Sequence, residues 1–234
     1  ILCIRNIMSV KIMSVAKKLP KYVKETKEII PYVKQWMQDQ ESRFQRKVLK
    51  IFEGAGVDKR YSIMDAEEVF LNTSFEEKNN IYIKEVTKLA EQSLLKSLKK
   101  ARLQTTDIDY IVTVSCTGIM IPSVDAYLIN SLQMRQDIVR LPVTEMGCVA
   151  GISGIIYAKN FLKSNPNKRA AIVSVEAATA TFQMEDYSMA NIVSAAIFGD
   201  GAASVILSSF EEDEGPIIRD EAMYHFYDSI DIMG

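Results

Sequence analysis

One stretch in the middle of the chain, Val-Thr-Glu-Met-Gly-Cys-Val-Ala-Gly at residues 143–151, limits the possible folds more than any other. The apolar run at 138–143 predicts a buried strand. Residues 148–162 carry apolar or small side chains on every side, with Lys159 as the only charge, which is typical of a helix buried all round. The stretch therefore predicts a strand–turn–helix unit with a cysteine, Cys148, where the helix begins.

The position of Cys148 suits a nucleophile. The first turn of a helix leaves backbone N–H groups unpaired and carries the positive end of the helix dipole, and both stabilise a thiolate. The small neighbours Gly147, Ala150 and Gly151 let backbone or a substrate carbonyl approach closely. Most free cysteines are nevertheless small buried core residues. The position alone leaves both interpretations open.

Composition and charge narrow the class of protein. The 234 residues are 48% hydrophobic and 25% charged, with a net charge of −2, which is typical of a soluble globular protein with one large or two small domains. This charge provides no general attraction to nucleic acid or to an anionic membrane, and no segment predicts a membrane span. Cys3, Cys116 and Cys148 are too few for a disulfide framework, and no Cys/His cluster predicts a metal site. A reducing cytoplasm fits this cysteine usage.

Strands that alternate with helices predict an α/β layer fold with a mostly parallel central sheet. The chain begins with isoleucine, and Met8 is a more natural start. We therefore expect residues 1–7 to be an upstream extension and residues 8–234 to form the folded domain. Strands are expected at 10–16, 110–115, 138–143, 169–175, within 195–207 and at 217–226, and helices at 26–53, from 73 to 101, at 123–132 and at 148–162.

Two of the predicted helices carry further signals. Lys47 and Lys50 are three residues apart in the 26–53 helix and share one of its faces, for which a solvated surface is the simplest interpretation. Thr73 and Glu76 have the spacing of a capping box at the start of the next helix.

Three motifs together resemble a known family. They are Gly-Cys-Val-Ala-Gly at 147–151, Thr-Ala-Thr-Phe at 179–182 and Phe-Gly-Asp-Gly-Ala-Ala at 198–203. In this order and context they resemble the thiolase superfamily, and most closely the type III polyketide synthases, which are chalcone and stilbene synthase-like enzymes. The resemblance implies a thiolase-like layered fold, with helices around a mostly parallel mixed sheet, and matches the N-terminal half of the duplicated αβαβα subunit.

The resemblance also implies a reaction and a set of roles. Such enzymes are cytoplasmic homodimers without a permanently bound cofactor or metal. They load an acyl group from acyl-CoA onto a cysteine and extend it with malonyl-CoA by decarboxylative condensation. The matching positions are Cys148 as nucleophile, Phe198 as gate, Cys116, Thr117 and Thr181 as cavity lining, Lys47 and Lys50 for coenzyme A phosphates, and Ile121 as a contact to the partner's cavity.

Plainer alternatives exist for several of these positions. Phe198 could be a core aromatic residue and Cys116 an inert buried thiol, and Lys47 and Lys50 could be only a solvated face. A further basic position of the family corresponds to Gly54, so we expect the phosphate-binding set to be incomplete or differently built.

The resemblance has one large gap. The family's catalytic histidine and asparagine lie in the second half of the subunit, which is absent from these residues. The only histidine, His225, precedes that region and is expected to be a strand or loop residue. The 234 residues are therefore expected to be inactive alone. Two other functions stay open: a β-ketoacyl-acyl carrier protein synthase III-type enzyme, and a non-catalytic thiolase-like subunit that binds acyl groups or a partner.

Overall fold

The computed structural model describes residues 9–71 and 74–229. A five-stranded mixed sheet forms the centre, in the order β1-β7-β6-β4-β5. Its neighbours β4–β5 and β4–β6 are parallel, whereas β6–β7 and β1–β7 are antiparallel. The five strands are β1 (Lys11–Lys18), β4 (Tyr110–Val114), β5 (Val139–Val143), β6 (Arg169–Ala177) and β7 (Asp200–Ser208). The α/β prediction is confirmed: four of the five strands run in the same direction, and only β7 runs opposite to them.

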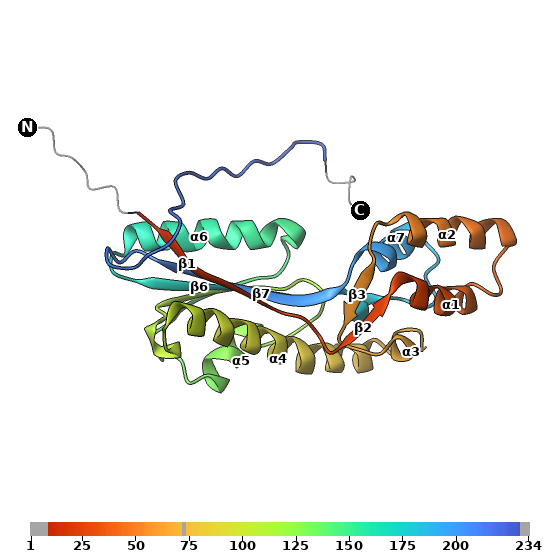
Figure 1. Ribbon diagram of the computed structural model, residues 1–234, viewed down its shortest axis with the longest axis horizontal. Helices are drawn as coiled ribbons and strands as arrows, with labels where there is room; N and C mark the ends of the chain where they lie inside the picture. The colour runs from red at the N-terminus through yellow and green to blue at the C-terminus, as the bar shows by residue number, and fades with distance from the viewer. Residues whose placement is uncertain (1–8, 72–73, 230–234) are drawn as a thin grey trace, which may run out of the picture.

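Helices cover both faces of this sheet. On one face lie α4 (Phe75–Ala101) and α5 (Val124–Ser131), and on the other lies α6 (Ala150–Ser164) (Figure 1). All five residues of the central strand β4 are buried, because it has a strand on either side and a helix layer above and below. One apolar cluster fills the α4 side of the sheet and a second fills the α6 side. The fold therefore has three layers, with the sheet between two layers of helices.

A smaller group of elements extends beyond one end of the sheet (Figure 1). It contains the antiparallel pair β2 (Tyr22–Glu25) and β3 (Lys59–Ser62), with α1 (Thr26–Trp36), α2 (Ser42–Gly54), α3 (Ala66–Val69) and α7 (Met189–Ile197). Its own core is built around Trp36, whose indole packs against Phe70, Phe182 and Tyr187.

The predicted single helix at 26–53 is wrong, because the chain forms two helices, α1 and α2, with a turn between them. The Gln45 side-chain amide donates to the backbone oxygens of Gln38 and Gln40 in this turn. The two helices contact each other and bury Trp36 and Phe52 in one core. The break thus lets two short helices share one core, which a continuous helix could not do.

The capping box of α4 is shifted by one residue from the prediction. Ser74 is the N-cap, and its hydroxyl accepts from Glu77 N while the Glu77 carboxylate accepts from Ser74 N. Thr73, the cap expected from the sequence, lies outside the described residues.

The strand predicted at 217–226 is also wrong. Ile217 forms only an isolated bridge to Lys11, and residues 218–226 are neither helix nor strand. After Ile218, whose N–H donates to Val10 O, the chain leaves the sheet edge and passes over α6 (Figure 1). There Glu221 forms an ion pair with Lys159, which is only 1% exposed. The ion pair on α6 replaces further strand pairing.

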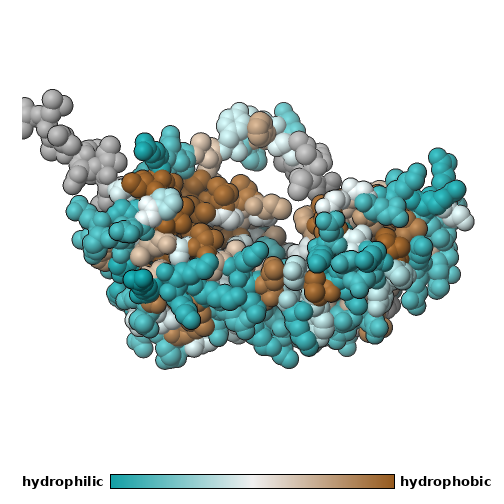
Figure 2. Space-filling model, in the orientation of Figure 1, coloured by the Kyte–Doolittle hydropathy of each residue, from teal (hydrophilic) through white to brown (hydrophobic). Residues whose placement is uncertain are grey.

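The burial expected around residues 138–162 is only partly observed. β5 is an edge strand, and its Val139 is 47% exposed. Helix α6 begins at Ala150 after a 3-10 turn, η2 (Gly147–Val149), and buries one face against β4 and β6. Its other side exposes Ile152, and hydrophobic side chains gather over this helix in Figure 2. The helix therefore has an uncovered apolar side.

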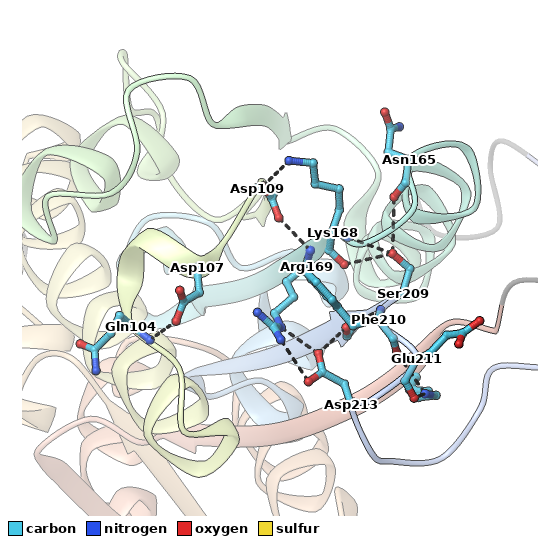
Figure 3. Close-up of polar contacts among 12 residues, drawn as sticks. Gln104, Asp107, Asp109, Asn165, Lys168, Arg169, Ser209, Phe210, Glu211 and Asp213 are labelled. Atoms are coloured by element: carbon cyan, nitrogen blue, oxygen red, sulfur yellow. Dashed lines mark hydrogen bonds and ion pairs between the residues drawn. The ribbon is translucent and has the colours of Figure 1, made fainter.

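The amino ends of the parallel strands are joined by charged side chains (Figure 3). Asp109 accepts from Arg135 Nη1 at 2.7 Å, from Lys168 Nζ at 2.8 Å and from Arg169 N at 3.0 Å. The Arg169 guanidinium pairs with Asp213. Each carboxylate in this network is paired with a cation. The network therefore holds β4 and β6 together at their amino ends, opposite the carboxyl ends that Cys116 and Cys148 follow.

Among residues 9–71 and 74–229, no helix has both the length and the apolar character that crossing a bilayer requires.

Candidate active site

Both described cysteines lie at the carboxyl edge of the parallel strands. Cys116 follows β4, Cys148 lies in η2 after β5, and Glu176 is near the end of β6. Because β4 is paired in parallel with both other strands, the three residues meet at one edge of the sheet. This is where ligands bind in open α/β sheets. Both thiols are exposed and neither forms a disulfide.

Glu176 ties the loop after β4 to β6. Its carboxylate accepts from Cys116 N at 3.0 and 3.1 Å and from Thr117 N at 3.1 Å. The Thr117 hydroxyl donates to it at 2.6 Å and accepts from Ala177 N at 2.8 Å. Glu176 therefore fixes both Cys116 and Thr117. It escaped prediction, although a carboxylate near the end of an otherwise apolar strand is a usable signal.

The two cysteines differ in environment. Cys116 is exposed as a whole residue, but partial desolvation of its thiol, and then the neighbouring Glu176 carboxylate, raise the pKa of that thiol to about 11, and Cys148 contributes to the same effect. Cys116 is therefore a neutral thiol at neutral pH and a poor nucleophile. Cys148 stands in η2 directly before α6, as the sequence predicts, and its nucleophilic role stays a prediction.

Thr181 and Phe198 lie together at a different place, in the wall of a cavity of about 140 Å³. The cavity lies between the β2–β3 pair, α3, α7 and the 3-10 turn η3 (Ala178–Thr181). Phe198 follows directly after α7 and is 42% exposed, so it is no core residue. Cys116, Thr117 and Cys148 do not line this cavity.

The Gly-Asp-Gly turn after Phe198 holds one wall of the cavity in place. The buried Asp200 accepts from Thr179 N at 3.0 Å, from the Thr179 hydroxyl and from Ile63 N at 2.8 Å. Burial raises the pKa of the Asp200 carboxyl. One carboxylate thereby joins η3, β7 and the segment after β3.

Lys47 and Lys50 lie in an open groove on α2 with two further cations, Arg43 and Arg46. Among the described residues, none of these four side chains forms an ion pair or hydrogen bond. The two arginines were missed by prediction, although each lies one helical turn before one of the lysines. Gly54 ends α2 and adds no charge.

Ile121 projects from the loop after β4 and is 93% exposed. Helix α4 supports this loop, because the Asn79 amide accepts from Ile119 N at 2.9 Å and donates to Ile119 O at 2.8 Å. Gly118 lies so close to the Tyr82 ring that a Cβ there would be 2.4 Å from it. The loop is thus held in place and directs Ile121 outward.

His225 is exposed in the segment after β7 and, within the described part of the chain, forms no hydrogen bond or ion pair. It lies outside helix and strand, so it is a loop residue. In the same described part, no three His, Cys, Asp or Glu side chains are grouped to hold a metal ion.

A mixed sheet between helix layers, with a cysteine at the turn between the parallel strand β5 and the half-covered helix α6, is the arrangement of a thiolase-like α/β protein. Residues 4–210 match the family described as chalcone and stilbene synthases, N-terminal domain, and the chain belongs to this family.

Relatives and solved structures agree with this assignment. Phloroglucinol synthase of Pseudomonas fluorescens is 30% identical over 168 residues, which cover 72% of this chain and 48% of that protein. The 1,3,6,8-tetrahydroxynaphthalene synthase of Streptomyces coelicolor is 32% identical over 159 residues, covering 68% and 42%. The crystal structure of that synthase, a bacterial type III polyketide synthase, superposes with a TM-score of 0.80 at 28% identity, covering 86% of this chain and 57% of that chain. The chain thus spans about half the length of the curated relatives it matches.

Proposed function

We propose that these residues form the nucleophile-bearing half of a type III polyketide synthase. The observation that carries the proposal is the position of Cys148, exposed in η2 at the carboxyl edge of β4, β5 and β6 and directly before α6. The family match and the names of the relatives support a polyketide synthase.

In the proposed loading step, the Cys148 thiolate attacks the thioester carbonyl of an acyl-CoA. A new carbon–sulfur bond forms, the bond to coenzyme A sulfur breaks, and the coenzyme A thiolate leaves and takes up a proton. Unpaired N–H groups at the start of the helix are available to stabilise the developing oxyanion. Cys116 does not compete, because its raised pKa keeps it protonated.

The other residues take supporting roles in the proposal. The four cations on α2, including Lys47 and Lys50, hold the coenzyme A phosphates. Phe198 controls access to the acyl cavity, and Thr181 lines it. Cys116 and Thr117 form the wall beside Cys148, held there by Glu176.

Extension of the loaded acyl group is proposed for the whole protein. Malonyl-CoA loses carbon dioxide, and the resulting enolate attacks the acyl thioester carbonyl on Cys148. A carbon–carbon bond forms, the bond to the Cys148 sulfur breaks, the Cys148 thiolate leaves, and the extended acyl group stays on coenzyme A. The enolate needs preorganised donors, which the family supplies as a histidine and an asparagine from its second half. His225 stands exposed in a loop, so we propose that these 234 residues load acyl groups but do not condense them. We further propose a cytoplasmic homodimer, in which the exposed Ile121 enters the partner's cavity, with no resident cofactor.

The loading step is tested by incubating the chain with hexanoyl-CoA and mapping the acyl group by peptide mass spectrometry. We expect acylation of the Cys148 peptide, its loss in Cys148→Ala and its retention in Cys116→Ala. Acylation of Cys116 alone, or of neither cysteine, contradicts the proposal and favours a non-catalytic acyl-binding or partner subunit.

The basic groove on α2 also suits a second donor. Four exposed cations can hold an acidic carrier protein as well as coenzyme A, as in a β-ketoacyl-acyl carrier protein synthase III-type enzyme. Comparing hexanoyl-CoA with hexanoyl-carrier protein separates these alternatives. Faster transfer from the carrier protein would favour the second.

A further inference from the structure

Arg60 is a buried cation without a counter-ion. It lies in β3 and is 8% exposed. Its Nη1 donates to the Thr26 hydroxyl at 2.8 Å, and its Nη2 donates to Ala196 O. Its Nε finds no hydrogen-bond partner, and the guanidinium forms no ion pair, among the residues that the structure describes.

Leaving such a group unpaired is unfavourable. A buried charge is costly unless it is both hydrogen-bonded and neutralised, and burial accordingly lowers the pKa of Arg60. The Phe52 ring lies 5.6 Å from its guanidinium carbon and supplies a weak cation–π contact. Ala196 O contributes only the partial negative charge of the end of α7. Among the described residues, the Arg60 charge is therefore hydrogen-bonded but not neutralised.

Arg60 lies in the wall of the cavity that Thr181 and Phe198 also line. The wall is largely apolar and aromatic, with Ile29, Phe52, Val69, Phe70 and Phe182. Of the residues that the structure describes, one acid lines it: Asp65, which is the N-cap of α3 and accepts from Glu67 N. The cavity volume of about 140 Å³ is close to the roughly 150 Å³ of an engineered apolar cavity that holds benzene.

We propose that this cavity binds a small apolar molecule that ends in a carboxylate, with the carboxylate on Arg60. The planar guanidinium matches a carboxylate, and each of its Nη atoms carries a second N–H beyond the one that it donates to Thr26 or Ala196. The apolar rings hold the rest of the molecule. The same chemistry is found in a free carboxylic acid and in the far end of a dicarboxylic acyl thioester. The second source rests on the proposed function, whereas carboxylate recognition itself does not.

Recognition is measured on the unmodified chain with benzoate and its neutral analogue benzamide. Trp36 is the only tryptophan and contacts Phe70 and Phe182, which line the cavity, so its fluorescence reports occupancy. We expect benzoate to bind at least about tenfold more tightly than benzamide, because only benzoate neutralises the guanidinium. Equal affinities, or no binding of either, overturn the proposal.

Variants identify the group responsible. Arg60→Gln is expected to abolish the preference for benzoate, and Arg60→Lys to retain part of it. Arg219→Gln, which removes an exposed cation elsewhere, is the matched control and should keep the full preference. If Arg60→Gln does not fold, Arg60→Lys and the unmodified chain still decide the question. A folded Arg60→Gln that retains the preference overturns the proposal.

A second arm separates the two sources of carboxylate. Loading of Cys148 from glutaryl-CoA is compared with loading from valeryl-CoA, a neutral acyl group of the same length. A glutaryl advantage that Arg60→Lys reduces supports an acyl chain with a terminal carboxylate, and equal loading with a retained benzoate preference supports a free acid. A benzoate preference without any loading contradicts the proposed function alone, and loading without that preference contradicts the carboxylate site alone.

Discussion

The environment of Cys116 makes a quantitative prediction about thiol reactivity. Raising its pKa from the ordinary 9.0 to about 11 lowers the thiolate fraction at pH 8 roughly a hundredfold. A thiolate of higher pKa is intrinsically more nucleophilic. With a Brønsted coefficient of about 0.4–0.5, the rate constant of the Cys116 thiolate itself is raised roughly tenfold. We therefore expect iodoacetamide to label Cys116 about tenfold more slowly than a free cysteine, with a rate that rises with pH up to about 11.

The perturbation is Glu176→Gln. It is made in a Cys148→Ser background, so that Cys116 is the only cysteine left in the described part of the chain and its labelling is measured alone. Removing the carboxylate charge lowers the pKa of Cys116, but burial is the larger cause and stays in place. Labelling at pH 8 should therefore accelerate only about two- to fivefold. Glutamine keeps an oxygen that can accept from Cys116 N, so the loop should remain attached to β6.

The assay is peptide mass mapping of alkylated Cys116 over time, with melting curves to confirm that the variant folds. Glu145→Gln is the matched control, because Glu145 also raises the pKa of Cys116 but is the smallest of the causes. An unchanged rate in folded Glu176→Gln, or an equal acceleration in Glu145→Gln, would refute the assignment of this effect to Glu176.

Three further predictions concern the proposed reaction. Cys148 should be alkylated at least about tenfold faster than Cys116 at neutral pH, since the raised pKa of Cys116 lowers its thiolate fraction; equal rates by mass mapping would contradict this. Phe198→Ala in the whole enzyme should change product length or starter range with little loss of melting temperature, and a large loss with unchanged products would favour a packing role. The purified chain should be oligomeric or aggregate, because Ile121, Val149 and Ile152 are exposed; a monodisperse monomer by light scattering would contradict this. The same chain should release no carbon dioxide from malonyl-CoA, and measurable release would contradict that expectation.

Several features of the fold could be predicted because they depend on nearby residues. The periodicity of apolar residues located α4 and α6, and the β-branched run at 110–115 located β4. The strand–turn–helix unit around Cys148 was predicted from the residues of one short segment, and the alternation of elements predicted an α/β sheet. The three motifs were sufficient for the family, which the match over residues 4–210 confirms.

Predictions failed where distant parts of the chain decide the outcome. Whether β5 is central or at an edge depends on the order of strands in the sheet, so its apolar composition could not show that Val139 is exposed. Lys159 is the only charge in its helix, and the partner that lets it be buried, Glu221, comes from another segment that the helix sequence could not identify. The path of residues 218–226 depends on that same pair rather than on strand propensity.

The class of fold, the family and the place of Cys148 could be predicted from the chain, because each depends on short motifs or on the local pattern of side chains. Three features became visible only when distant segments were placed together. Glu176 holds Cys116 and Thr117. Four cations, two of them not predicted, share the groove on α2. Arg60 lies in a cavity wall with no ion pair among the described residues. Burial, charge pairing and the pKa of a thiol depend on distances across the fold. Periodicity along the chain carries no information about which distant segments will supply the neighbours.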